Sequence, residues 1–122
     1  GPDGALYVSA PTLAPRDGIY RVSPEGAVTT FCEGFGRPQG LAFDSEGQLY
    51  VVDAVAGSSA VYRIRADRPE IKDCVLSGGA LLGLTFDPLG GLVVCSSETV
   101  YRLDVGLRGV LPVQPIASPM LT

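Results

Sequence analysis

A phrase that recurs every 43 residues constrains the fold more than any other feature of this 122-residue chain. Residues 40–53 read GLAFDSEGQLYVVD, and residues 83–96 read GLTFDPLGGLVVCS. The same offset taken backwards aligns residues 4–7 with residues 47–50. A fixed period of this length indicates one structural unit repeated along the chain, so the repeat takes precedence over any local pattern.

Each copy of the repeat reads as a series of short β-strands. Runs rich in valine, tyrosine, leucine and phenylalanine are bounded by glycine, proline, aspartate and serine, which is typical of strands joined by turns. A second phrase, Tyr-Arg between two apolar residues, recurs at residues 19–22, 61–64 and 100–103. In the middle copy the predicted strands are residues 41–43, 49–52, 61–65 and a segment near residues 74–76. No segment has helical apolar spacing over three turns, so we expect essentially no helix.

Four antiparallel strands in every forty-odd residues is the signature of a propeller blade, whose sheet is covered on both faces by its neighbours. We therefore predict an all-β fold of antiparallel four-stranded blades that form part of a propeller. The first predicted blade is residues 1–39, which lacks its inner strand; the second is residues 40–82 and the third is residues 83–111. The proline-rich tail, residues 112–122, is predicted either to dock as an extended arm or to be disordered.

Three blades do not close a ring, because propellers usually need about four to eight. The open flanks of such an arc would expose apolar blade faces and an unpaired strand edge, both of which favour assembly. The chain opens with Gly1 and Pro2 rather than Met, as though cut from a longer polypeptide. The predicted partner is therefore either the remaining blades of a parent chain or a second copy that completes the ring.

The amino-acid composition argues against several classes of function. Thirteen acidic and nine basic residues give a formal charge of −4 and an isoelectric point near 4.6, so the chain has no net cationic field to attract nucleic acid or anionic lipid. The chain has no histidine, which removes Ser-His-Asp and Cys-His nucleophiles and histidine-ligated zinc from what it alone supplies. Its apolar runs are too short for a membrane helix. We expect a soluble protein without a nucleic-acid or membrane partner.

Cysteine usage is sparse and unpatterned. Cys32, Cys74 and Cys95 are an odd number and form no CxxC pair. We predict buried free thiols, which mildly favours a reducing compartment.

Two phrases carry a resemblance to a known group of proteins. Residues 37–44, RPQGLAFD, and residues 47–53, GQLYVVD, resemble the NHL-repeat and gluconolactonase/senescence-marker-protein (regucalcin-like) propellers, which are most often six-bladed. The resemblance extends to about Leu111 and implies roughly half of a six-bladed propeller. The group includes calcium- or zinc-dependent lactonases and esterases, strictosidine-synthase-like enzymes, and NHL scaffolds that bind protein, peptide or RNA, and the fold does not choose among them.

Strand alternation places the expected ligand site at one end of the channel. The connections that follow the second strand and precede the first strand of each blade gather at that end, where Arg37, Gln39 and Asp53 are the candidate ligand-binding residues. In the lactonases of the resemblance, an Asn or Asp metal ligand precedes the Gly-Leu that opens the inner strand. Gln39 and Leu82 hold that position here, so neither a metal ligand nor a catalytic residue is predicted in this segment. Calcium or zinc, if the full parent binds one, would need ligands from other blades.

Each candidate also has a structural interpretation. Asp53 aligns with Ala10 and Ser96, so the repeat does not require a carboxylate there. Asp53 can instead end its strand by binding nearby backbone N–H groups, or pair with Arg63. Arg37 can be an ordinary solvated loop residue.

A tyrosine and an arginine recur in all three copies, which favours packing, with the arginine heads reaching solvent or an aspartate such as Asp44 or Asp87. The alternative is a stacking ladder for bases or sugars. The recurrent residues are Tyr20, Arg21, Tyr62, Arg63, Tyr101 and Arg102.

Two functional hypotheses follow. The first is a partial propeller that binds a small molecule or protein at the channel mouth without a complete catalytic site. The second is part of a metal-dependent, lactonase-like hydrolase acting on lactones or esters, in which this half supplies wall residues.

Overall fold

The computed structural model describes residues 1–12, 16–54, 59–106 and 109–110. These residues form β-strands joined by turns, with no helix among them, and every strand pairing is antiparallel. The predicted all-β fold is therefore confirmed. Across the same residues no helix suited to crossing a membrane is found. The predicted tail, residues 112–122, lies outside the described residues.

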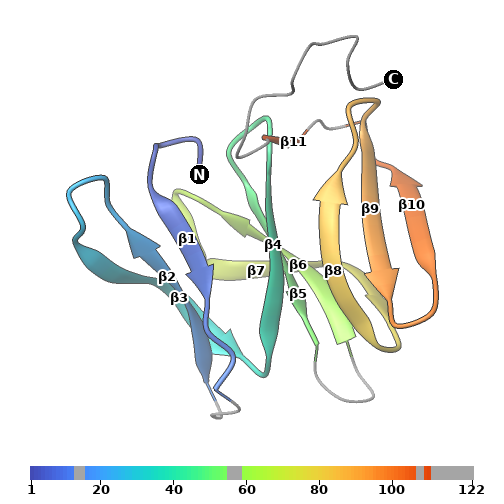
Figure 1. Cartoon of the computed structure of the whole chain (residues 1–122), viewed down its shortest axis with the longest axis horizontal. Helices are drawn as coiled ribbons and strands as arrows, with labels where there is room; N and C mark the ends of the chain where they lie inside the picture. The colour runs from blue at the N-terminus through green and yellow to red at the C-terminus, as the bar shows by residue number, and fades with distance from the viewer. Residues whose placement is uncertain (13–15, 55–58, 107–108, 111–122) are drawn as a thin grey trace, which may run out of the picture.

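The strands form three sheets that lie side by side in Figure 1. The first sheet contains β1 (Leu6–Ser9), β2 (Asp17–Val22) and β3 (Val28–Phe35), in that order. The middle sheet contains, from one edge to the other, β11 (Gly109–Val110), β4 (Pro38–Asp44), β5 (Leu49–Asp53), β6 (Ser59–Arg65) and β7 (Arg68–Gly78). The third sheet contains β8 (Leu81–Phe86), β9 (Gly91–Ser96) and β10 (Val100–Asp104).

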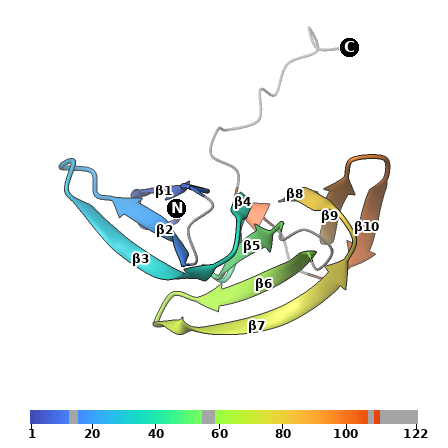
Figure 2. The same ribbon diagram turned by 90° about the horizontal axis from the view of Figure 1, so that it is seen from below.

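The three sheets are arranged as an arc of propeller blades. Figure 2 shows β4 and β8 toward the inner side of the arc and β3 and β7 toward its outer side. The first sheet begins with β1, which aligns in the repeat with β5, so among the described residues this sheet contains no strand equivalent to β4. The structure therefore confirms a partial propeller-like fold.

Two apolar cores fill the spaces between neighbouring sheets. In the first core, Ile19, Cys32 and Phe35 of the first sheet pack with Leu49, Val51 and Ile64 of the middle sheet. In the second core, Tyr50, Val52 and Val61 of the middle sheet pack with Leu81, Phe86, Leu92 and Val94 of the third sheet. Alternation along a strand sends successive side chains to opposite faces, so β5 supplies both cores. This explains why its sequence is a continuous apolar run rather than an alternating one.

An aspartate and a glycine build the turn between the first two strands of a repeat. Asp44 Oδ1 accepts hydrogen bonds from the backbone N–H groups of Glu46 and Gln48, at 2.9 Å each. Gly47 supplies a φ of 83°, a left-handed conformation that other residues adopt at a cost. The β8–β9 turn repeats the arrangement with Asp87 and Gly90, whose φ is 90°.

The inner strands β4 and β8 come close enough that only glycine fits at their contact. A Cβ added to Gly40 would lie 2.9 Å from Cα of Gly83 and 3.1 Å from the backbone nitrogen of Leu84. Gly40 therefore lets two neighbouring blades converge toward the inner side of the arc.

Two features of the middle sheet differ from the strands predicted by sequence. The outer strand β7 runs for 11 residues, Arg68–Gly78, rather than only near residues 74–76. Strand β11 pairs with the free edge of β4, with Gly109 opposite Asp44 and Val110 opposite Phe43. A strand edge accepts any extended segment that reaches it, and apolar periodicity does not encode that pairing.

The cysteines are free, but the prediction that they are buried is wrong for two of the three. Cys32 is buried in the first core, Cys95 is half-buried and Cys74 is exposed. Cys74 lies on β7, the outermost strand of its sheet, which has no neighbouring strand beyond it to cover it.

We expect Gly40→Ala to lower the free energy of unfolding by about 1–3 kcal/mol, because the added methyl group would overpack the contact between β4 and β8. Urea unfolding followed by circular dichroism measures the change. Gly79→Ala is the matched control, since nothing lies within 4 Å of a Cβ at Gly79. Equal stability of the two variants would contradict the importance of the contact.

Candidate functional site

The connections predicted to gather at one end of the arc do so within each sheet. In the middle sheet Pro38 pairs with Asp53, and Ser59 pairs with Gly78. The first sheet is tied to this end, because the Ser9 hydroxyl donates a hydrogen bond of 2.7 Å to the backbone carbonyl of Gln39. This places the start of β4 and the ends of β1, β5 and β7 together. We call this end the mouth, defined by Arg37, Gln39 and Asp53.

Asp53 binds the backbone that leads into β4. Its Oδ2 accepts a 3.1 Å hydrogen bond from the N–H of Gly36, and its Oδ1 accepts a 2.6 Å hydrogen bond from the N–H of Arg37. The N–H of Ala54 donates to the carbonyl of Arg37 at 2.9 Å, which completes the link. Asp53 is buried, so its carboxylate holds the segment between β3 and β4 in place.

The alternative pairing of Asp53 with Arg63 is not what the structure shows. Arg63 Nη2 lies 3.3 Å from Oδ2 of Asp73 on the neighbouring strand β7.

Arg37 and Gln39 combine a fixed backbone with unengaged side chains. Their backbone groups are held by Asp53, Ala54 and Ser9, as described above. Arg37 is exposed and Gln39 is half-buried. Among the described residues, neither the guanidinium nor the side-chain amide has a hydrogen-bonding partner. Such a pair offers a cation and a neutral donor and acceptor to a ligand at little cost in protein rearrangement.

The recurrent arginines reach aspartates at the opposite end of the sheets, as the packing interpretation predicted. Arg102 pairs with Asp87, and Arg21 lies 2.9 Å from Asp3. The hydrogen bond from Arg102, followed by the N–H of Gly91, lowers the pKa of Asp87 to about 2. These two pairs lie at the turn end of the first and third sheets, so they are remote from the mouth.

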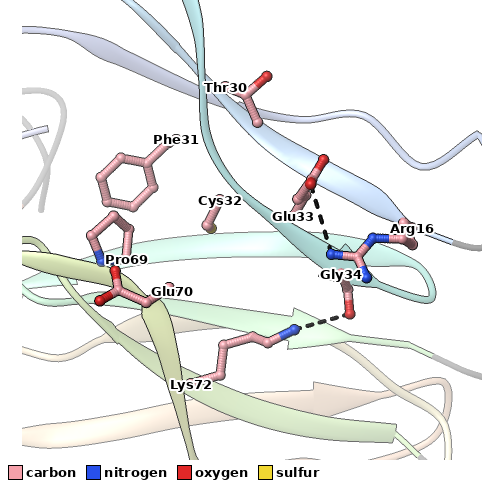
Figure 3. A pocket seen from close by; sticks show the side chains of 9 residues that line it. All are labelled: Arg16, Thr30, Phe31, Cys32, Glu33, Gly34, Pro69, Glu70 and Lys72. Atoms are coloured by element: carbon pink, nitrogen blue, oxygen red, sulfur yellow. Dashed lines mark hydrogen bonds and ion pairs between the residues drawn. The ribbon is translucent and has the colours of Figure 1, made fainter.

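A cavity of about 700 Å³ lies elsewhere, between β3 and β7 on the outer side of the arc (Figure 3). Lys72 Nζ donates a 2.9 Å hydrogen bond to the carbonyl of Gly34 and sits 4.6 Å from the centre of the Phe35 ring. Besides Gly34 and Lys72, the cavity is lined by Arg16, Thr30, Phe31, Cys32, Glu33, Pro69 and Glu70. Sequence reasoning missed this cavity, because its two walls come from strands in different repeats and no motif links them.

The outer cavity offers neither a reactive thiol nor an unpaired cation among its described lining residues. Burial raises the pKa of the Cys32 thiol to about 11, so the thiol is protonated and a poor nucleophile at neutral pH. The two cations each have a partner, since Arg16 faces Glu33 at 3.7 Å and Lys72 is bound as described.

A second cavity of about 420 Å³ lies between the end of β7 and β10. It is lined by Leu76, Ser77, Gly78, Gly79, Leu81, Tyr101, Arg102 and Leu103. Neither of these two cavities includes a residue of the mouth.

The mouth residues do not fit a divalent metal ion. Such ions prefer several oxygen ligands with carboxylates among them. Gln39 supplies one neutral oxygen, the hydrocarbon side chain of Leu82 supplies none, and both oxygens of Asp53 already accept backbone hydrogen bonds. In the part of the chain that the structure describes, no three His, Cys, Asp or Glu residues form a possible metal cluster.

We expect Asp53→Ala to lower the free energy of unfolding by about 1–3 kcal/mol, because two partly buried backbone N–H groups lose their acceptor. Thermal and urea unfolding measure the loss. Asp67→Ala is the control, because its ion pair with Arg65 is exposed and worth about 1 kcal/mol or less. If both variants unfold alike, Asp53 does not anchor the mouth.

Comparison with known proteins was made on sequence and on structure. No protein-family model matches the sequence, and no curated protein does. A solved crystal structure described as that of a presumed gluconolactonase matches with a TM-score of 0.69 and 25% sequence identity. The match covers 92% of this chain but 46% of that chain, so this chain spans less than half of its length. The likeness supports the gluconolactonase part of the sequence resemblance and a partial propeller-like fold.

Proposed function

We propose that this chain is one arc of a gluconolactonase-like propeller, which we expect to have six blades, and that it binds a small oxygen-rich ligand at the mouth. The observation that carries the proposal is the structural likeness to a presumed gluconolactonase over 92% of the chain. The ligand class that fits is a sugar lactone or the hydroxy acid formed when it opens.

The mouth residues have distinct roles in this proposal. The Arg37 guanidinium pairs with the ligand carboxylate or lactone oxygen, which a planar fork of N–H donors does well. The Gln39 amide donates to and accepts from ligand hydroxyl groups. Asp53 is a positioning residue, because it fixes the backbone that carries Arg37 without a free oxygen for catalysis.

Binding without turnover is the activity we assign to the arc by itself. Lactone hydrolysis needs an activated water or another nucleophile, and a general base. The chain has no histidine, and its mouth residues do not fit a metal ion that could activate water.

A second candidate is a metal-dependent lactonase or esterase whose ligands lie on blades that this chain does not supply. The description of the matched structure as a presumed gluconolactonase favours it. In that enzyme Arg37 and Gln39 would form part of the substrate wall.

Titration calorimetry with gluconate and glucono-δ-lactone tests the proposal. We expect binding to the wild-type chain, and a loss of about tenfold or more in affinity for Arg37→Ala and Gln39→Ala, because each removes a direct polar contact. Arg65→Ala is the control, since Arg65 lies at the opposite end of β6 and is half-exposed.

Two outcomes would contradict the proposal. Unchanged affinity in both mouth variants would place the ligand elsewhere. Lactone turnover by this chain that requires added calcium or zinc and stops with a chelator would overturn the assignment of binding alone.

A further inference from the structure

The first sheet has one face that none of the described residues covers. Register places Leu6 and Val28 opposite Val22, and Val8 opposite Tyr20, so these side chains share a face. Leu6 is 63% exposed and Val28 is 65% exposed. We call these five residues the first free face. Contiguous apolar side chains of this kind mark an interaction surface.

The third sheet also has one uncovered face, at the other end of the arc. Val93 and Cys95 alternate along β9, and Val100 of β10 lies opposite Cys95, so the three side chains share a face. Val100 is 70% exposed, while Val93 and Cys95 are half-buried. We call these three residues the second free face.

The repeat shows that the first free face is one side of the interface between blades. Leu6 aligns with Leu49 in the middle sheet and with Leu92 in the third sheet. Leu49 and Leu92 are both 0% exposed, because each packs against the preceding sheet of the arc. Within the part of the chain that the structure describes, no sheet precedes that of Leu6.

The second free face is the other side of the same interface. Val100 aligns with Ile19 in the first sheet and Val61 in the middle sheet. Ile19 lies in the core with Leu49, and Val61 lies in the core with Leu92. The two uncovered faces are therefore the two halves of a contact that the chain already makes twice.

We propose that a second copy of this chain places its second free face on the first free face of this copy, and reciprocally, so that two chains close one ring. The partner is a second copy because its free faces continue, position by position, the two interfaces within the arc. The length of the chain is consistent with this pairing, because two copies would account for about nine-tenths of the matched propeller chain.

The contact joins two different faces, yet in a pair of chains both free faces of each copy are covered. Such a head-to-tail contact gives a closed ring when the rotation closes and an open filament when it does not. Two arcs related by a twofold axis along the channel use both free faces of each copy. Association then stops at two chains.

Sedimentation equilibrium on the 122-residue chain tests the ring. We expect twice the chain mass for the wild type. Leu6→Glu and Val100→Glu should each weaken the dimer by about tenfold or more, because each places a charge in an apolar contact. Both side chains are exposed in the single chain, so circular dichroism should show an unchanged fold.

Leu89→Glu is the matched control. Leu89 is 81% exposed but lies in the β8–β9 turn, away from both free faces, so its variant should remain dimeric. An equimolar mixture of Leu6→Glu and Val100→Glu keeps one unmodified interface. It should therefore dimerise more strongly than either variant alone.

Three results would overturn the proposal. A monomeric wild type would mean that the free faces do not pair. A dimer that survives Val100→Glu but not Leu6→Glu would mean that two first free faces pack on each other. A mass above two copies would mean that the contact does not close a ring.

Discussion

Burial of both faces of the middle sheet is the constraint on which the rest of this structure depends. Strand β5 sends Leu49 and Val51 into one core and Tyr50 and Val52 into the other, and all four are buried. A sheet of this kind cannot be stable alone, because each face needs apolar cover. The flanking sheets provide it, and their own outer faces then remain open.

The same packing positions the mouth. Convergence of β4 and β8 at Gly40 brings the starts of the inner strands together, and Asp53 then fixes the backbone just before β4. These two constraints fix the backbone positions of Arg37 and Gln39, whose side chains have no hydrogen-bonding partner among the described residues. Core packing thus places two polar side chains at the mouth, and the proposed ligand binding depends on them.

Much of the fold could be predicted from sequence, because a repeat reports the same local physics several times. The Asp44 and Gly47 turn recurs with Asp87 and Gly90, and apolar runs locate the buried strands. The pairing of β11 with β4 and the exposure of Cys74 could not be predicted, since they depend on which edges stay free in three dimensions. For Asp53, sequence left alternatives open, and coordinates were needed to show its backbone partners. Whether the mouth binds a ligand stays a prediction.

Hydrogen–deuterium exchange with residue-level readout tests the central claim most directly. If the middle sheet is enclosed by its neighbours, backbone amides of β5 should be the slowest to exchange in the single chain, at concentrations below those that permit the proposed dimer. Those of β1 and β10 should then exchange faster, because one face of each is uncovered in the single chain. Equal protection across β1, β5 and β10, or fastest exchange in β5, would contradict the stacked arrangement.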